Sequence, residues 1–208
     1  MIRLYDYWRS SAAYRVRIVL ALKGVAYERV AVNLLAGEQA ADANRARNSQ
    51  GLVPTLEVDG TMLTQSLAII DYLDATYPDP PMVPSDPIAR SHVLAQALVI
   101  AADTHPLHNL RVLKRLESQF GVDQAGREDW YRHWVRECFD ALEATVGAGP
   151  FLGGDAPNLA DVCLVPQMYN ARRFALDVTA WPKLAAADAA CTALPAFAAA
   201  HPDRVKPD

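Results

Sequence analysis

Half of the residues in the segment 78–87 are proline, and this segment constrains the fold more than any other part of the chain. Proline lacks a backbone N–H and holds φ near one value, so a regular helix or strand does not continue through such a density. A chain of 208 residues is long enough for two small domains. We therefore predict one domain over residues 1–79, a linker over 80–87 and a second domain over 88–208.

The residues before the linker predict strands and helices in the order βαβ-α-ββα. The first two strands enclose a helix and should be parallel, whereas Asp59-Gly60 between two apolar stretches predicts an antiparallel hairpin. Pro54 cannot donate a ladder hydrogen bond, so it marks the first residue of a strand or an edge strand. The expected strands are 4–8, 25–32, 52–58 and 61–64, and the expected helices are 12–22, a surface helix over 36–48, and one that opens at 65.

The residues after the linker show helical patterns and no strand pattern. Residues 88–120 form a long helical pattern that is interrupted near Pro106, and 127–146 form a second helix. Asn158, with Asp161 three positions later, resembles a capping box for an apolar helix at the centre of the domain. Short helices over 184–191 and 195–200 complete the chain. The expected fold class is thus an α+β domain followed by an all-α domain.

The composition predicts a soluble cytoplasmic protein. A net charge of −4 argues against general nucleic-acid binding, because a phosphate-binding surface needs an excess of Lys and Arg. The longest apolar run is broken by Gln96 and Asp103 and is too short to span a membrane, and the first strand begins too early for a signal peptide. Cys138, Cys163 and Cys191 are odd in number and widely spaced, which predicts reduced thiols rather than disulfides or zinc.

A strand, two serines and a helix follow one another at the start of the chain. A serine at this junction can cap the helix by accepting hydrogen bonds from its first free N–H groups. Those N–H groups concentrate positive potential, and Arg9, Arg15 and Arg17 add charge nearby. The junction is therefore a candidate anion-binding site. A plain helix cap followed by arginines that face water is the alternative.

Five motifs resemble the zeta class of the glutathione transferases, in the same order and over essentially the whole chain. The class usually continues its serine motif as Ser-Ser-Cys, whereas this chain has Ala12 in the third place, so a serine must act without that cysteine. The motifs are Trp8-Arg9-Ser10-Ser11 with Tyr14-Arg15-Val16-Arg17, Leu52-Val53-Pro54-Thr55-Leu56, Gln65-Ser66-Leu67-Ala68-Ile69-Ile70, His105-Pro106-Leu107-His108-Asn109-Leu110, and Leu159-Ala160-Asp161-Val162-Cys163-Leu164-Val165-Pro166-Gln167.

The resemblance implies an architecture and an activity. The first domain should be thioredoxin-like and the second all-helical, in a homodimer that takes glutathione as cofactor. The implied activity is the cis–trans isomerisation of a small acidic substrate, maleylacetoacetate, by reversible addition of the glutathione thiolate to its C=C bond. Maleylpyruvate as substrate and a general conjugating transferase are the alternatives. A non-catalytic binding module on the same fold is a further one.

The resemblance assigns catalytic roles to Ser10, Ser11 and Arg9. Ser10 is expected to donate a hydrogen bond to the glutathione sulfur, with Ser11 beside it as a second choice or a plain cap. Arg9 and Arg173 are expected to bind the carboxylates of the substrate, because a guanidinium grips a carboxylate with two parallel hydrogen bonds. Arg172 is expected to be a solvated surface charge.

Further residues are assigned to the cofactor. Val53 should hold the cysteinyl backbone of glutathione through its N–H and C=O, and the resemblance implies that its bond to Pro54 is cis. His105 and Asn109 should lie one helical turn apart on one face, either near the sulfur or packed against the first domain. No metal site is expected, since His105 and His108 have no third ligand near them. The expected glutathione-binding residues are Ser10, Val53, Pro54, Gln65, Ser66, His105 and Asn109, of which Gln65 and Ser66 suit the γ-glutamyl carboxylate or an ordinary N-cap.

Overall fold

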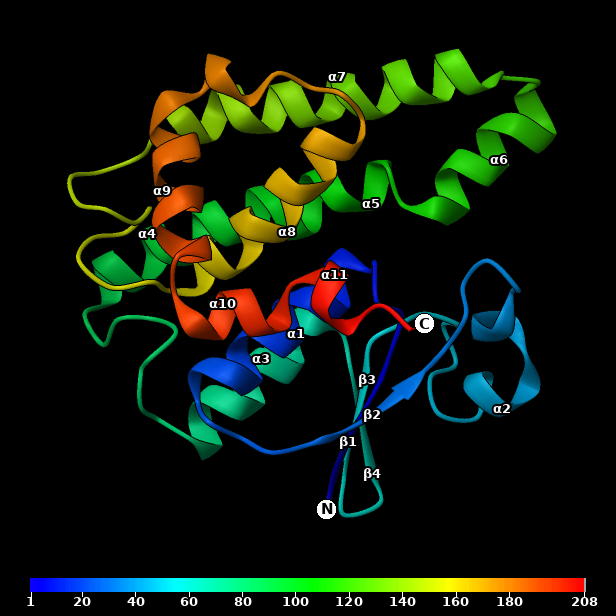
Figure 1. Cartoon of the computed structure of the whole chain (residues 1–208), viewed down its shortest axis with the longest axis horizontal. Coiled ribbons are helices and arrows are strands. Elements are labelled where there is room, and N and C mark those ends of the chain that lie inside the picture. Colours follow the sequence, from blue (N-terminus) through cyan, green and yellow to red (C-terminus); the bar gives the residue numbers. More distant parts are fainter. Residues whose placement is uncertain (208) are drawn as a thin grey trace. The chain divides into compact units, whose positions relative to one another are not determined.

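The computed structural model describes residues 1–207 and divides into two compact units (Figure 1). The first unit comprises Met1–Met82 together with Ala193–Asp208, and the second comprises Val83–Thr192. The junction at residue 82 falls within the proline-rich segment. The C-terminal residues, however, pack in the first unit, whereas the sequence places them in the helical domain.

A four-stranded sheet forms the centre of the first unit, with the strand order β2-β1-β3-β4. β1 (Ile2–Asp6) and β2 (Glu28–Ala31) are parallel, and β3 (Thr55–Val58) and β4 (Thr61–Thr64) form an antiparallel hairpin. The predicted parallel pair and the predicted hairpin are both confirmed. Pro54 stands immediately before the central strand β3, in agreement with a strand start and not with an edge strand.

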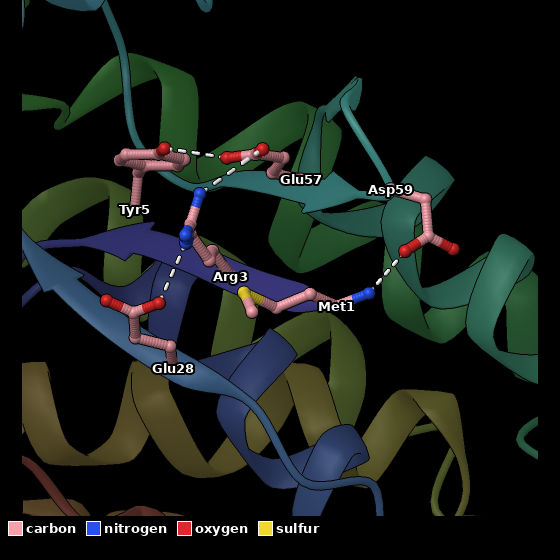
Figure 2. Close-up of polar contacts among 6 residues, drawn as sticks. All are labelled: Met1, Arg3, Tyr5, Glu28, Glu57 and Asp59. Carbon is pink, nitrogen blue, oxygen red and sulfur yellow. Dashed lines mark hydrogen bonds and ion pairs between the residues drawn. The ribbon is translucent and has the colours of Figure 1, made fainter.

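Cross-strand polar pairs cover one face of the sheet (Figure 2). Arg3 Nε donates to Glu28 at 2.7 Å and Arg3 Nη1 lies 3.6 Å from Glu57, while the Tyr5 hydroxyl donates to Glu57 at 2.7 Å. Successive residues of a strand point to opposite faces. Arg3 and Tyr5 therefore share this polar face, and Leu4, which is fully buried, points to the other. These pairs join β2, β1 and β3 in one register.

Helices α1 (Ser11–Leu22), α3 (Ser66–Thr76) and α10 (Pro195–Ala200) pack together in the first unit, and α11 (Pro202–Val205) follows α10 (Figure 1). Phe197 of α10 is fully buried there. Because burial of an aromatic side chain removes a large apolar area from water, this contact explains why the last residues belong to the first unit.

The prediction of one surface helix over 36–48 is wrong. The segment forms a 3₁₀ turn, η1 (Glu38–Ala40), and a single helical turn, α2 (Asp42–Arg45). Ala41 between them is extended, with ψ of 153°, and Gly37 before them has a φ of 79°. The alanine and arginine content favours helix locally, but these backbone bends end it within one turn.

The second unit is built from helices. The predicted interruption near Pro106 is confirmed, because α4 (Pro87–Leu98) passes through a π-helical turn, η2 (Val99–Thr104), into α5 (His105–Leu107), and α6 begins only at Leu110. None of the helices in residues 1–207 is long and apolar enough to cross a membrane. The remaining elements are α6 (Leu110–Phe120), α7 (Gln124–Glu143), α8 (Leu159–Arg173), η3 (Val178–Ala180) and α9 (Pro182–Thr192).

Helix α8 is the central helix of this unit, and most of its residues are buried. The predicted capping box at its start is confirmed: the Asn158 side chain accepts from the Ala160 N–H at 2.8 Å, and Asp161 accepts from the Asn158 N–H at 3.0 Å. Asp161 also accepts from the Leu152 N–H at 2.9 Å. The carboxylate therefore joins the helix start to the preceding loop.

Candidate functional site

The register of the sheet brings three predicted site segments to one end of the first unit. Tyr5 of β1 pairs with Thr55 of β3, and Thr55 pairs with Thr64 of β4. The turn after β1, the residues before β3 and the residues after β4 must therefore leave the sheet at the same end. Those segments carry the predicted residues Arg9, Ser10, Ser11, Val53, Pro54, Gln65 and Ser66.

Ser10 caps helix α1. Its backbone is extended, its Oγ accepts from the Ala13 N–H at 3.3 Å, and its own N–H donates to the Tyr7 carbonyl at 2.8 Å. A hydroxyl that accepts one hydrogen bond still has a proton to donate. The structural role as a cap and the predicted role as a donor to a sulfur are thus compatible in Ser10. Ser11 is the first residue of α1 and is buried.

Arg9 follows Trp8 and precedes the cap residue Ser10 in the sequence. Its guanidinium carbon is 5.1 Å from the centroid of the Trp8 ring, within the range of a cation–π contact. The side chain is half-buried. The guanidinium of Arg9 thus lies against the Trp8 ring; its contact with a substrate carboxylate stays a prediction.

The bond between Val53 and Pro54 is cis, which confirms the isomer that the resemblance implies. Gln65 has a φ of 68° and stands immediately before α3. It does not cap the helix with its side chain; instead its Nε2 donates to Gln50 Oε1 at 2.6 Å. Ser66 begins α3, and its Oγ accepts from Arg15 Nη1 at 3.4 Å. Gln65 is thus the N-cap residue of α3 by position, as the alternative interpretation expected, but its side chain makes no capping hydrogen bond.

Arg15 was expected to add charge near this end of the sheet, with an arginine that faces water as the alternative, whereas Gln50 was not expected here. Arg15 is only 2% exposed, and it links α1 to the start of α3 through Ser66. The sequence carried a signal for Arg15, because it stands four positions before Val19 and therefore falls on the apolar face of the first helix. Gln50 carried no such signal.

Arg173 ends helix α8 in the second unit. Its Nη1 donates to the Asn170 side chain at 2.8 Å, and its guanidinium carbon lies 5.7 Å from the centroid of the Phe174 ring and 5.9 Å from that of Tyr169. The side chain is exposed. Asn170 thus orients one edge of the guanidinium, and sequence reasoning missed this residue. Arg172 pairs with Asp188 at 2.7 Å and is about half exposed, so it is not simply a solvated charge.

His105 and Asn109 do not share a helical face, and that prediction is wrong. Helix α5 ends at Leu107, and Asn109 is the extended cap of α6, where its side chain accepts from the Arg111 N–H at 3.1 Å. His105 stacks on His108, with ring centroids 5.6 Å apart. The chain bends between the two residues, so a spacing of four does not place them one turn apart. Whether they contact glutathione stays a prediction.

A buried aromatic stack supports the end of α8. The Tyr131 and Phe174 rings are parallel within 8°, and their centroids are 3.7 Å apart. The centroid of the His108 ring lies 4.1 Å from that of Tyr131. Burial raises the pKa of the Tyr131 phenol above its usual range, against the opposing charge of Arg173. The stack holds the ring of Phe174, the residue that follows Arg173, against Tyr131.

The cysteines are all buried, and none stands at the serine motif. Burial raises the pKa of the Cys191 thiol, and the neighbouring Asp161 and Asp188 raise it further. A protonated, buried thiol is not a nucleophile. Among residues 1–207, no group of three or more His, Cys, Asp or Glu side chains could hold a metal ion.

Two helix starts and the residues before β3 gather at one end of the sheet in the first unit. Two helices, α1 and α3, begin at the same end of the sheet, and each has a serine as its first residue, where the helix dipole favours negative charge. The residues Val53-Pro54 immediately precede β3 and lie outside its residue pairs with β1 and β4.

Comparison with known proteins identifies the class to which this fold and site belong. Residues 4–81 match the protein family described as "Glutathione S-transferase, N-terminal domain". A solved structure titled as the holo form of maleyl pyruvate isomerase, a bacterial zeta-class glutathione S-transferase, is 43% identical and covers 98% of each chain with a TM-score of 0.96. The chain belongs to the zeta class of the glutathione S-transferase family.

Two relatives bear names that specify a reaction. The maleylacetoacetate isomerase of Rhizobium meliloti (strain 1021) is 49% identical over 98% of this chain and 97% of its own. A maleylacetoacetate isomerase of Anaeromyxobacter dehalogenans 2CP-1, solved with dicarboxyethyl glutathione and citrate in its active site, is 48% identical with a TM-score of 0.88, and the match covers 99% of this chain and 96% of that one.

Proposed function

We propose that this protein is a glutathione-dependent cis–trans isomerase that converts maleylacetoacetate to fumarylacetoacetate in aromatic amino-acid catabolism. One observation carries the proposal: the Ser10 hydroxyl caps α1 at the end of the sheet that also carries the cis Val53–Pro54 bond and the start of α3. The similarity to the two maleylacetoacetate isomerases supports the choice of reaction.

Glutathione supplies the nucleophile when it is bound: its thiolate adds reversibly to the maleyl C=C bond, which can turn as a single bond before the thiolate leaves. Ser10 stabilises the sulfur as thiolate by donating a hydrogen bond to it from its hydroxyl, which keeps its proton, with Ser11 as the neighbouring donor. A free thiol has a pKa of about 8.5, and each unit of lowering needs about 1.4 kcal/mol of preferential stabilisation of the thiolate. One charge-assisted hydrogen bond and the start of a helix are of that size.

The remaining glutathione contacts follow from the backbone. Val53 binds the cysteinyl part of the tripeptide through its N–H and C=O, and Pro54 fixes the direction of these groups. Gln65 and Ser66 bind the γ-glutamyl carboxylate at the start of α3, where the helix favours negative charge. The resemblance also assigns His105 and Asn109 to glutathione.

Arg9 and Arg173 bind the carboxylates of the substrate. The orientation of Arg173 by Asn170 supports this role, because a guanidinium held along one edge presents its other edge to a planar anion. Arginine donors also stabilise the negative charge that develops on the substrate's carbonyl oxygen. The dicarboxyethyl glutathione in the Anaeromyxobacter dehalogenans structure, a glutathione that carries two carboxylates, supports a diacid as the second substrate.

Maleylpyruvate is the second candidate substrate. The similarity to the solved zeta-class maleyl pyruvate isomerase favours it, and the two acids share the maleyl group and differ only in the tail beyond it. We also propose that the enzyme works as a homodimer in the cytoplasm, as the resemblance to the class implies.

The experiment is a side-by-side assay of the purified protein with maleylacetoacetate and maleylpyruvate, with and without glutathione. We expect turnover only with glutathione, a higher kcat/KM for maleylacetoacetate, and an unchanged count of free thiols at the end. Consumption of glutathione would indicate a conjugating transferase. Failure of the protein to bind immobilised glutathione would indicate a module without this chemistry.

A further inference from the structure

A buried guanidinium joins three parts of the first unit. Arg17 of α1 is 1% exposed. Its Nη1 donates to Asp6 at 2.6 Å, its Nη2 donates to the Trp8 carbonyl at 2.9 Å, and its Nε donates to the Ala200 carbonyl of α10 at 3.1 Å. One side chain thus contacts the end of β1, the turn that leads to Ser10, and the C-terminal helix.

The turn from Trp8 to Ser10 has further contacts. Its backbone is closed by the hydrogen bond from the Ser10 N–H to the Tyr7 carbonyl. The Trp8 ring receives two cations, because the Arg9 guanidinium carbon lies 5.1 Å from its centroid and Lys206 Nζ lies 5.6 Å from it. Lys206 follows α11, so the C-terminal segment contacts this turn a second time.

The ionic cost of burying Arg17 is met within the same cluster. Asp6 is fully buried and accepts from Arg17 through one oxygen, while Arg29 Nε lies 3.2 Å from the other. Burial raises the pKa of the Asp6 carboxyl, and the two guanidiniums oppose that rise. Removing one partner of such a pair leaves the other charge uncompensated. Arg17 therefore has few alternative positions.

We propose that Arg17 is a positioning residue for the reaction: it fixes the turn from Trp8 to Ser10 against the C-terminal helix, and so sets the direction of the Ser10 hydroxyl. The inference rests on the proposed function of Ser10. A donor to a thiolate must be held within a few tenths of an ångström of its best geometry, and that geometry depends on the residues that support it.

Arginine suits this task and lysine does not. The planar fork of a guanidinium reaches three acceptors in different directions, whereas an ammonium is a compact point charge on a flexible stem. Arg17→Lys keeps a charge next to Asp6 and gives up the carbonyls of Trp8 and Ala200. Arg29→Lys is the matched control, because Arg29 shares the Asp6 carboxylate, and in residues 1–207 no hydrogen bond joins it to either carbonyl.

The test is a titration of the bound glutathione thiol by its ultraviolet thiolate absorbance in wild type and both variants. We expect Arg17→Lys to raise the pKa of that thiol by about one unit, to lower kcat at neutral pH about tenfold, and to regain most of the wild-type kcat at alkaline pH. Arg29→Lys should shift the thiol pKa much less. An equal shift in the two variants, or a loss in Arg17→Lys that is the same at every pH, would overturn the proposal.

A second measurement uses the wild-type protein, so that it does not depend on a variant that folds. The Ser10 and Ala198 amides are each hydrogen-bonded, to the carbonyls of Tyr7 and Leu194. If Arg17 joins the turn to α10, the two amides should become exposed by the same opening of the structure. Native-state hydrogen exchange should then give similar opening free energies for both. Exchange at Ser10 more than about a hundredfold faster than at Ala198 would refute the link. This result is independent of the isomerase assay, whereas a wild type that does not bind glutathione would reject the proposed function alone.

Discussion

The Ser10 hydroxyl can accept one hydrogen bond and donate another, so alanine at this position tests both roles together. Ser10→Ala removes both, and the loss of the cap should destabilise α1 by about 1 kcal/mol. We expect a much larger effect on turnover at neutral pH than on glutathione binding, together with a higher pKa of the bound thiol. Ultraviolet titration of the wild-type and variant complexes measures this. Ser11→Ala is the control, and a shift in that variant instead would transfer the donor role to Ser11.

Arg173 is expected to contact the acidic substrate and not glutathione. Its substitution should therefore weaken the binding of the acid and leave the affinity for glutathione unchanged. Arg173→Ala should lower kcat/KM by a factor that corresponds to about 1.5–3 kcal/mol of lost transition-state stabilisation, the usual size of a charge-assisted hydrogen bond. Arg173→Lys should recover only part of this, because a lysine lacks the two-pronged geometry. Steady-state kinetics with each acid, alongside calorimetry with glutathione, provide the comparison.

Arg172→Ala is the matched control for that series, since Arg172 is the neighbouring guanidinium and pairs with Asp188. If Arg173→Ala weakens glutathione and leaves the kinetics of the acid unchanged, Arg173 belongs to the cofactor site. Arg9 would then be the remaining candidate for the substrate's carboxylate.

At the scale of single elements, the start of α8 depends on the Asp161 carboxylate. Asp161→Asn keeps the shape but replaces one of its two accepting oxygens by an NH₂ group, which cannot accept from the Leu152 or Asn158 N–H. A buried N–H left without a partner costs about 1–3 kcal/mol. We expect chemical denaturation to show a loss of that size, and Asp155→Asn, in the exposed part of the same loop, to show almost none.

The same variant carries a pH dependence of known sign. Burial raises the pKa of Asp161 in the folded state, and hydrogen bonds from the backbone only partly oppose this. The stability that Asp161 contributes by titration is therefore present below its unfolded pKa of about 3.9 and is lost as the pH rises through the folded pKa. The advantage of wild type over Asp161→Asn should be larger at about pH 4 than at neutral pH.

Elements that depend on local signals could be predicted from the sequence. The hairpin at Asp59-Gly60, the capping box at Asn158 and the break after Pro106 each rest on residues that act within a few positions. The break itself, however, misled the placement of His105 and Asn109, because a spacing rule holds only while the helix continues. The hydrogen bond from Gln65 to Gln50 and the one from Arg173 to Asn170 join side chains whose partners no local pattern identifies.

At the scale of the whole molecule, the return of the C-terminal residues to the first unit could not be predicted. The helix over 195–200 was expected correctly, but its apolar face gives no sign of which neighbour covers it. Tertiary contacts decide this, here through the burial of Phe197 and the hydrogen bond from Arg17 to the Ala200 carbonyl. A domain boundary drawn from a linker alone therefore misses a segment that crosses back.

The assembly of the molecule is a prediction of the same scale. We expect sedimentation equilibrium at micromolar concentration to give twice the chain mass of 22.8 kDa. Dimers of this kind commonly bury about 1,600 Å² or more, so dilution to nanomolar concentration should leave most of them intact. A single-chain mass at micromolar concentration would remove the homodimer from the proposal and leave the fold and the chemistry standing.

The backbone conformation at Gln65 lowers the stability of the free protein at a position that we propose binds glutathione. A φ of 68° with ψ of 116° is a conformation that glycine adopts freely and other residues adopt at about 1–3 kcal/mol. Gln65→Gly should therefore raise the free energy of unfolding of the free protein while it lowers the affinity for glutathione. Gln65→Ala, which keeps the unfavourable backbone and lacks the amide, should lower the affinity without the gain in stability. Thermal unfolding and calorimetry on this pair would show that a chain optimised only to fold would carry glycine at position 65.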